Sequence, residues 1–300
     1  MSARLFDKLW FFECFIPFLS ILDIARFERS LTLTSTPTSV GCTSTTVIEV
    51  LKSVYKSRRH ELLDSIHTLQ SVNDECLRWI TMREFYCTQL DLSRCYTYTV
   101  AGLEALLIPM AFRLKKLKIM NSDLNDVTEL LSSDLLSEEL EELVLFVYID
   151  GSYNFKNYKK LHTVVIDLDE NDSSNFVRFP TSLKHLTILN TKMYLTGINE
   201  LTQLQSLDLS LCCISNDDDL SKNLKRLTSL TELKINMGHE DQYGNDNEDD
   251  DFITSILWFP RSLIDLTILN AWISLKGINE FTQLEILDVI SCREVDEPAW

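Results

Sequence analysis

The chain contains an internal duplication, in which residues 179–212 return at residues 259–292, an offset of 80 positions. The two copies read FPTSLKHLTILNTKMYLTGINELTQLQSLDLSLC and FPRSLIDLTILNAWISLKGINEFTQLEILDVISC, and 20 of their 34 aligned positions are identical. Each copy holds two smaller units of the form L-x-x-L-x-L, such as Leu183, Leu186 and Ile188. Self-similarity at a fixed period is typical of a solenoid, in which one unit stacks on the next. The duplication therefore predicts a repeat architecture.

The same triplet recurs along most of the chain. In a strand, alternate side chains point to opposite faces, so the apolar residues of L-x-L face the core and those between them line an exposed face. Successive second members of the triplet are 27, 26, 21, 22, 21, 26, 33 and 21 residues apart, and all but one spacing lie within 20–29 residues. They are Leu90, Leu117, Leu143, Val164, Leu186, Leu207, Leu233, Leu266 and Leu287.

On these triplets, residues 81–300 resemble the leucine-rich repeat family. The resemblance implies an α/β solenoid of about nine repeats, with a parallel sheet on its concave side, preceded by an all-helical N-terminal region. It also implies a protein-binding scaffold rather than an enzyme. Consistent with that class, the seven glycines are isolated and the five histidines dispersed, and no phosphate-binding loop, nucleophile elbow or zinc-ligand spacing occurs. We expect no cofactor and no metal.

The eight cysteines favour a reducing compartment. Cys95, Cys212 and Cys292 each follow the last apolar strand residue by three positions, where the repeat pattern places Asn or Cys to bond the turn backbone. No C-x-x-C motif or disulfide-capped end is visible. We therefore expect a cytoplasmic or nuclear protein.

The N-terminal segment FIPFLSILDIARFERSL resembles the middle of an F-box. This resemblance implies that residues 1–31 bind a Skp-type adaptor of a cullin ubiquitin ligase, while the repeats hold a ubiquitination substrate. The alternative is an ordinary helical cap that seals the first repeat. The segment is too short and too polar to span a bilayer, and no membrane role is expected. The adaptor-contacting residues would be Phe15, Leu19, Asp23, Ile24 and Phe27.

Two further segments precede the repeats. Residues 32–46 are rich in Ser and Thr and are predicted to form a linker. Apolar residues then recur with helical periodicity from Val47 to Leu69, so residues 47–80 are predicted to form amphipathic helices.

Charge is unevenly distributed. The chain has 28 Lys and Arg against 45 Asp and Glu, and because residues 1–80 are neutral, the net charge of −17 falls on the repeats. Nucleic acid is a poor partner for such a surface. Acidic residues follow the strand ends and include an insertion at residues 240–251, so we expect either an acidic rim that attracts a basic protein or loops that keep the array soluble. The rim residues are Asp217, Asp218, Asp219, Glu248, Asp249, Asp250 and Asp251.

The exposed strand positions are the expected partner-binding residues. Apolar side chains occur in the third and fourth repeats, where solvated residues are usual, and more polar strands flank them. An apolar centre with a charged surround suits protein binding, although burial under a loop is the alternative. The predicted concave-face residues are Glu142, Val144, Phe146, Val147, His162, Val165, His185, Thr187 and Asp208.

Together these features predict an intracellular protein that acts by protein recognition. The leading hypothesis is a substrate receptor of a cullin-type ubiquitin ligase. The alternative is a stand-alone scaffold or inhibitor that binds a basic protein through the acidic rim.

Overall fold

A computed structural model describes residues 73–82, 87–93, 95, 97–120, 127, 130–131, 134–136, 138–146, 153–167, 177–191, 197–212, 223–236 and 253–294. These residues belong to a compact unit that spans residues 65–300, and residues 1–64 form a second unit. The predicted F-box-like segment, the linker and the helices from Val47 to Leu69 lie outside the described residues. So does the acidic insertion at residues 240–251.

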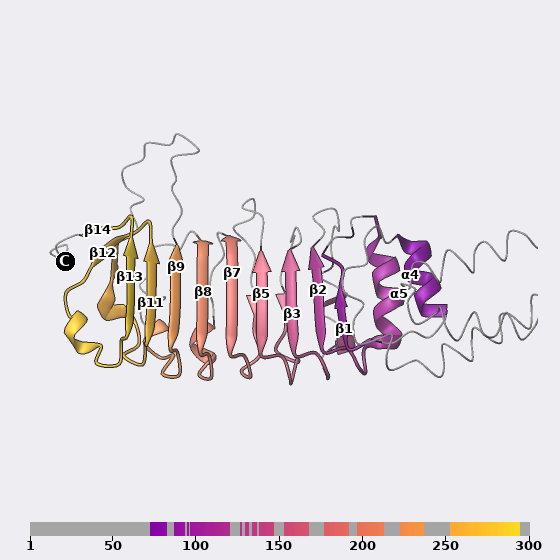
Figure 1. The fold of residues 1–300 in the computed structure, drawn as a ribbon. Helices are drawn as coiled ribbons and strands as arrows, with labels where there is room; N and C mark the ends of the chain where they lie inside the picture. The colour runs from indigo at the N-terminus through magenta and orange to yellow at the C-terminus, as the bar shows by residue number, and fades with distance from the viewer. Residues whose placement is uncertain are drawn as a thin grey trace, which may run out of the picture. The chain divides into compact units, whose positions relative to one another are not determined.

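A nine-stranded parallel sheet forms one face of the described unit (Figure 1). Its strands lie in chain order, with every neighbour parallel. The strands are β1 (Gln89–Asp91), β2 (Lys116–Met120), β3 (Glu142–Phe146), β5 (Thr163–Asp167), β7 (His185–Thr191), β8 (Ser206–Cys212), β9 (Glu232–Asn236), β11 (Asp265–Leu269) and β13 (Ile286–Ile290).

The register of this sheet aligns the apolar positions predicted from the repeat. Leu90 pairs with Leu117, Leu117 with Leu143, and the same row continues without a shift to Leu287 on β13. All nine predicted second positions therefore lie in one row, which confirms the leucine-rich parallel solenoid. The number of complete repeats stays a prediction, because several connecting segments lie outside the described residues.

Inward side chains of these strands form the core. Leu143 and Leu145 of β3 are fully buried, whereas Glu142, Val144 and Phe146 between them are partly exposed. β2, β5, β9 and β11 show the same alternation. The outward side chains of the nine strands line what we call the open face.

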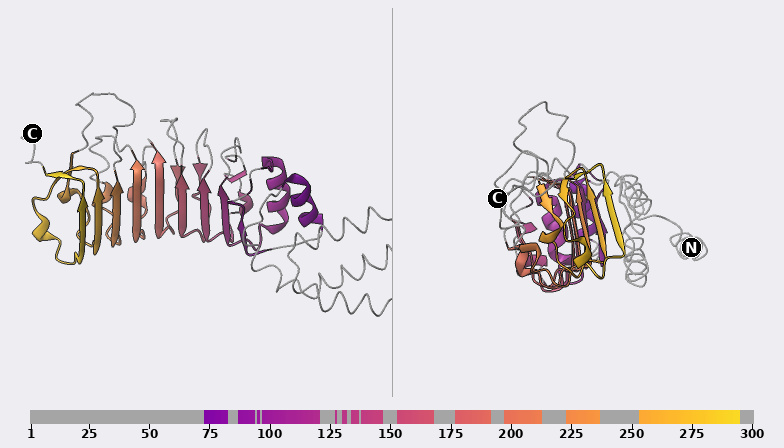
Figure 2. Two further views of the ribbon diagram at one scale, coloured as in Figure 1. Left: turned by 45° about the horizontal axis from the view of Figure 1, so that its top comes forward. Right: turned by 90° about the vertical axis from the view of Figure 1, so that its left-hand side faces the viewer.

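The connections return along the opposite side of the solenoid (Figure 2). There, two small parallel sheets stack in register with the repeats, and short 3-10 helices fill several of the remaining turns. The small sheets comprise β4 (Tyr153–Asn154) with β6 (Val177–Arg178), and β10 (Ile253–Ser255), β12 (Trp272–Ser274) and β14 (Arg293–Glu294); the 3-10 helices are η2 (Asp134–Leu136), η3 (Ile198–Glu200), η6 (Ile256–Trp258) and η7 (Ile278–Glu280).

Two α-helices lie beside β1 at one end of the sheet (Figure 1). α4 (Asp74–Met82) buries Leu77 and Ile80, and α5 (Val100–Met110) packs against it and connects β1 to β2. Thr99 caps α5, accepting a hydrogen bond from the Gly102 backbone N–H at 3.2 Å. The strand spacing alone does not predict α5, because a helix in one connection leaves that spacing within the usual range.

The cysteine positions agree in part with their predicted structural role. Cys95 is buried. The Cys292 thiol donates to the carbonyl oxygens of Ile268 and Ile290 at 3.5 and 3.4 Å, as expected for a residue that bonds the turn, but its side chain is partly exposed. The side chain of Cys212 lies outside the described part of the structure.

Two glycines at equivalent positions of the duplication offer a matched test of the fold. Gly197 and Gly277 have φ of 82° and 90°, where a side chain is strained. A Cβ at position 197 would meet nothing closer than 3.8 Å, whereas a Cβ at position 277 would lie 2.4 Å from Leu257 Cδ2. The cost of alanine should therefore differ between the two copies.

We expect Gly197→Ala to lower the free energy of unfolding by about 1–2 kcal/mol, the cost of the left-handed backbone alone. Gly277→Ala should cost more, because Leu257 must also move. Urea unfolding of the two variants measures the difference, with the unsubstituted chain as the reference. Equal losses would show that Leu257 adapts without cost.

Candidate protein-binding face

Three outward rows cross the open face of the sheet. The row nearest the strand starts runs from Lys116 through Glu142 and Thr163 to His185. The middle row is Asp91, Lys118, Val144, Val165, Thr187, Asp208, Lys234, Thr267 and Asp288. The row nearest the strand ends is Met120, Phe146, Asp167, Leu189, Ser210, Asn236, Leu269 and Ile290.

The structure brings most of the predicted concave-face residues together on the open face. Val144 and Val165 are direct neighbours, and the same row continues to Thr187 and Asp208. Glu142 and His185 flank Thr163 in the first row. These side chains share one surface, as the repeat pattern predicted.

His162 and Val147 differ from the other predicted residues. His162 lies one residue before β5, outside the three outward rows, and its backbone N–H donates to the Glu141 carbonyl at 3.0 Å. Its ring Nδ1 is 3.0 Å from Thr163 Oγ1. The sequence pattern placed His162 on the strand because the strand was expected to begin earlier. Val147, like all seven predicted rim residues, lies outside the described residues.

An apolar patch occupies the centre of the open face. Its side chains are all partly exposed and come from four adjacent strands. We call this group the central patch: Met120, Val144, Phe146, Val165 and Leu189. Sequence reasoning missed Met120 and Leu189, although each stands directly after the inward isoleucine of its triplet, Ile119 and Ile188.

Charged side chains surround the central patch. On one side, Lys116 Nζ of β2 lies 2.7 Å from Glu142 Oε2. On the other side, Lys234 Nζ lies 3.0 Å from Asp208 Oδ2, and the Ser210 hydroxyl donates to Asp208 Oδ1 at 2.5 Å. These two charge pairs beside the patch are therefore internal to the chain. Two further charged residues adjoin the patch: Lys118 lies next to Val144, and Asp167, which accepts a hydrogen bond from Asn190 Nδ2 at 2.8 Å, lies between Phe146 and Leu189.

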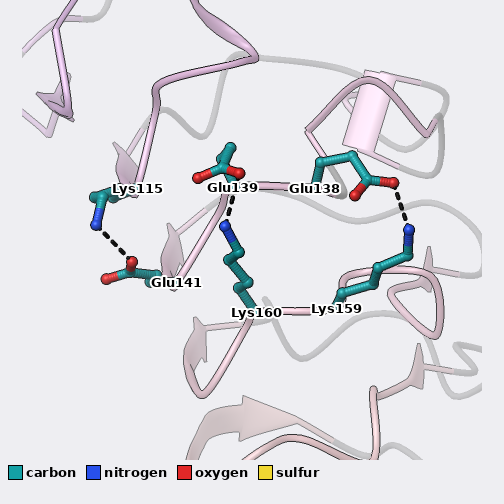
Figure 3. A network of polar contacts seen from close by, with 6 residues as sticks. All are labelled: Lys115, Glu138, Glu139, Glu141, Lys159 and Lys160. Carbon is teal, nitrogen blue, oxygen red and sulfur yellow. Dashed lines mark hydrogen bonds and ion pairs between the residues drawn. The ribbon is translucent and has the colours of Figure 1, made fainter.

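A ladder of ion pairs lies at the turns that precede β2, β3 and β5 (Figure 3). Each pair joins equivalent positions of adjacent repeats. The registers that pair Lys116 with Glu142 and Glu142 with Thr163 also align the residues before them. Each of these lysine Nζ atoms lies 2.7 or 2.8 Å from a carboxylate oxygen. The pairs are Lys115–Glu141, Lys160–Glu139 and Lys159–Glu138.

The ladder changes the ionisation of its members. The hydrogen bond from Lys115 holds the pKa of the Glu141 carboxyl below its ordinary value, and Glu141 in turn raises the pKa of Lys115. Both groups are solvent-exposed, so such pairs tune the surface more than they stabilise the fold.

A cavity of about 280 Å³ is separate from the central patch. Its lining consists of Lys156, Arg178, Phe179, Gly197 and Glu200. Lys156 Nζ lies 2.9 Å from Glu200 Oε2, so a cation and an anion of the lining already neutralise each other.

The described residues hold no group of three or more His, Cys, Asp or Glu arranged for a metal ion. Nor does any helix among them have the length and apolar character needed to cross a membrane. Burial raises the pKa of the Cys87 thiol to about 12, and its Sγ lies 3.7 Å from Met110 Sδ. Cys87 is therefore a core residue and not a nucleophile at neutral pH.

Comparisons with known proteins give structural neighbours only. No family model matches the sequence, and no curated protein matches it. An internalin, InlF, from Listeria monocytogenes is similar over 91% of this chain and 90% of its own, at 18% identity and a TM-score of 0.38. The functional domain of InlJ from the same organism is similar over 76% of this chain and 62% of its own, at 14% identity and a TM-score of 0.28. The assignment of the leucine-rich solenoid rests on the strand order and register of this chain itself.

The ion-pair ladder generates a prediction about pH. Since Glu141 has a lowered pKa, its pairing stabilises the folded state at neutral pH, and this contribution is lost as pH falls through the folded pKa. We expect Lys115→Met to raise the pKa of Glu141 toward its ordinary value, measured by carbon-13 NMR titration of the carboxyl.

Lys159→Met is the matched control, because Lys159 pairs with Glu138 and does not contribute to the shift of Glu141. An unchanged Glu141 pKa in Lys115→Met would show that the Lys115–Glu141 pair does not form in solution.

Proposed function

We propose that this chain is a protein-recognition scaffold that binds a partner through the central patch of its open face. The observation that carries the proposal is the pairing of Val144 with Val165 in the middle outward row. Two aliphatic side chains stand there side by side where the same row elsewhere carries Lys, Thr and Asp. Protein interfaces combine such an apolar centre with a polar rim.

The arrangement of charge supports this proposal. Burying a charged group in an interface is costly unless it is paired. Lys116 and Asp208 beside the patch already have partners within the chain, so a protein could cover them without leaving a charge alone. The patch also lies on strands rather than loops, so its side chains are held in place before a partner arrives.

Substitution of the central patch tests the proposal. We expect Val144→Thr with Val165→Thr to weaken partner binding at least tenfold, because each change puts a hydroxyl in place of a methyl group at the apolar centre. The fold should tolerate both changes, since Thr187 and Thr267 occupy the same row.

Photo-crosslinking measures partner binding. A benzophenone amino acid replaces Phe146, and the partner protein that it captures is quantified by mass spectrometry. Thr202→Val with Gln203→Ala, in an exposed turn before β8, is the control double variant and should leave capture unchanged. Equal capture by the patch variant and the control would exclude the central patch as the binding surface.

We further propose that the recognised protein is a ubiquitination substrate and that the chain is a cytoplasmic or nuclear substrate receptor of a cullin ligase. The support is the F-box-like segment at residues 15–31, which lies outside the described residues. The alternative role for that segment was a helical cap. The pair of helices α4 and α5 beside β1 already provides helical cover at that end of the sheet, which favours the adaptor-binding role (Figure 1).

Binding to a purified Skp-type adaptor tests this finer proposal. We expect the unsubstituted chain to bind and the Ile24→Asp, Phe27→Ala variant to lose binding, because both changes remove apolar contact surface from the segment. Thermal unfolding of the repeats should be the same in both proteins. If the well-folded chain does not bind, the stand-alone scaffold that attracts a basic protein through its acidic rim becomes the leading account.

A further inference from the structure

The central patch has a charged residue at each of two opposite corners. Strands β2, β3 and β5 lie side by side (Figure 1), and each contributes one residue to the middle outward row and one to the row nearest the strand ends. Lys118 lies at one corner of this block, and Asp167 lies at the diagonally opposite corner. The positions between them are all apolar: Met120, Val144, Phe146 and Val165.

The ammonium group of Lys118 has no partner among the described residues. Its side chain is partly exposed and takes part in no ion pair or side-chain hydrogen bond there. Its neighbour on β1, Asp91, instead accepts a hydrogen bond from the Ser93 backbone N–H at 2.9 Å. Lys118 is therefore a cation that a partner protein can meet with a carboxylate.

The negative charge of Asp167 exceeds what the fold requires. Asp167 Oδ1 accepts a hydrogen bond from the neutral side chain of Asn190 at 2.8 Å. In the second copy of the duplication, Asn270 takes the place of Asn190 and donates to Asn236 Oδ1 at 2.9 Å. An amide oxygen accepts the equivalent bond, so the turn does not need a carboxylate. The described residues give Asp167 no ion-pair partner, so its charge also remains for a partner protein.

The main chain of the sheet restricts what can lie on this block. Strands β2, β3 and β5 each have a neighbouring strand on both sides, so their backbone N–H and C=O groups are directed at those strands. An extended segment laid across the open face would bury backbone groups with nothing to bond. An α-helix bonds its own backbone internally and presents only side chains. A helix is therefore the element that this face can cover at least cost.

The distance between the two charged residues fits one face of a helix. Lys118 and Asp167 are two strands and two residues apart, which is about 12 Å at ordinary strand spacing and rise. Helix residues seven positions apart share a face and are about 10 Å apart along the axis, and side-chain length spans the remainder. Residues three and four positions along lie between them on the same face.

We propose that the central patch binds an amphipathic α-helix of a partner protein, with an acidic and a basic residue about seven positions apart and aliphatic residues between them. The proposal rests on the protein-recognition role proposed above and adds the kind of partner. The acidic residue meets Lys118, and the basic residue meets Asp167. The aliphatic residues cover Val144 and Phe146 in the middle of the block.

The two corner charges disfavour other helices. A helix with no charges would cover Lys118 and Asp167 and leave both unpaired, which is costly in an interface. A helix with two acidic residues would place one against Asp167, and one with two basic residues would place one against Lys118. Opposite charges at the two ends of an apolar face satisfy both corners.

Three labelled peptides test the proposal on the full 300-residue chain. Each is an alanine-rich helix of about 20 residues, long enough to form in water, with two adjacent leucines in its middle. The Glu–Lys peptide has Glu three positions before the leucines and Lys three positions after them. The Gln–Lys peptide replaces only the Glu, and the Glu–Gln peptide replaces only the Lys.

We expect the Glu–Lys peptide to bind at least threefold more tightly than either of the others, measured by fluorescence anisotropy at physiological salt. The comparison with the Gln–Lys peptide is the sharper one. The chain has a net charge of −17, so general attraction alone would make the more positive peptide bind best. A proline in the middle of the Glu–Lys peptide, on the face away from the leucines, breaks the helix and should weaken binding at least tenfold.

Two neutral variants of the chain assign each charge to its corner. In Lys118→Met, the Glu–Lys and Gln–Lys peptides should bind equally. In Asp167→Asn, which keeps an oxygen acceptor for Asn190, the Glu–Lys and Glu–Gln peptides should bind equally. Lys225→Met and Glu104→Gln remove exposed charges elsewhere and should leave every preference as it is in the unsubstituted chain.

Three results would overturn the proposal: no binding of any peptide, tightest binding of the Gln–Lys peptide, or equal binding of the proline peptide. The double variant Val144→Thr with Val165→Thr separates this failure from that of the protein-recognition role. If one of these results is found and capture from Phe146 is still lost in the double variant, the patch binds a partner of another kind. If capture is unchanged as well, the protein-recognition role fails too.

Discussion

The structure depends on one row of inward aliphatic side chains that runs through the parallel sheet from Leu90 to Leu287 and is buried on every strand as far as Leu266. No single repeat can bury its inward residues, so each is stabilised only by the one before and the one after it. A row held in constant register also fixes the outward residues between its members. Shifting one strand by a single residue would expose its leucines and bury its charges, and this cost is what makes the open face a defined surface.

The sequence predicted this frame well because its period is short and its constraint is local. Each strand can be recognised by two or three apolar residues at fixed spacing. The structure aligns the second apolar position of all nine triplets in one row. The elements that sequence reasoning missed are those without such a pattern. Helix α5 and the small sheets of β4 with β6 and of β10, β12 and β14 are set by how neighbouring connections stack, which a single unit of sequence does not encode.

The candidate binding surface could be predicted only in part. Val144 and Val165 were identifiable because they alternate with inward leucines and isoleucines inside a recognised strand. Met120 and Leu189 were missed because strand ends are the least certain part of a pattern. Pairing of charges could not be foreseen either: that Asp208 meets Lys234 follows from the strand register and not from the 26 residues that separate them.

The internal duplication gives the chain an internal reference for what its surfaces require. Where the two copies carry the same inward residue, as at Leu186 and Leu266, that residue is buried in the core. Where the copies carry different residues, the difference must follow from their surroundings. Ser206 and Ser210 lie on a strand with a neighbour on either side, and Ile286 and Ile290 lie on the last strand of the described sheet. Equivalent places in the repeat therefore require the same burial of inward residues but leave the outward residues to differ with their surroundings.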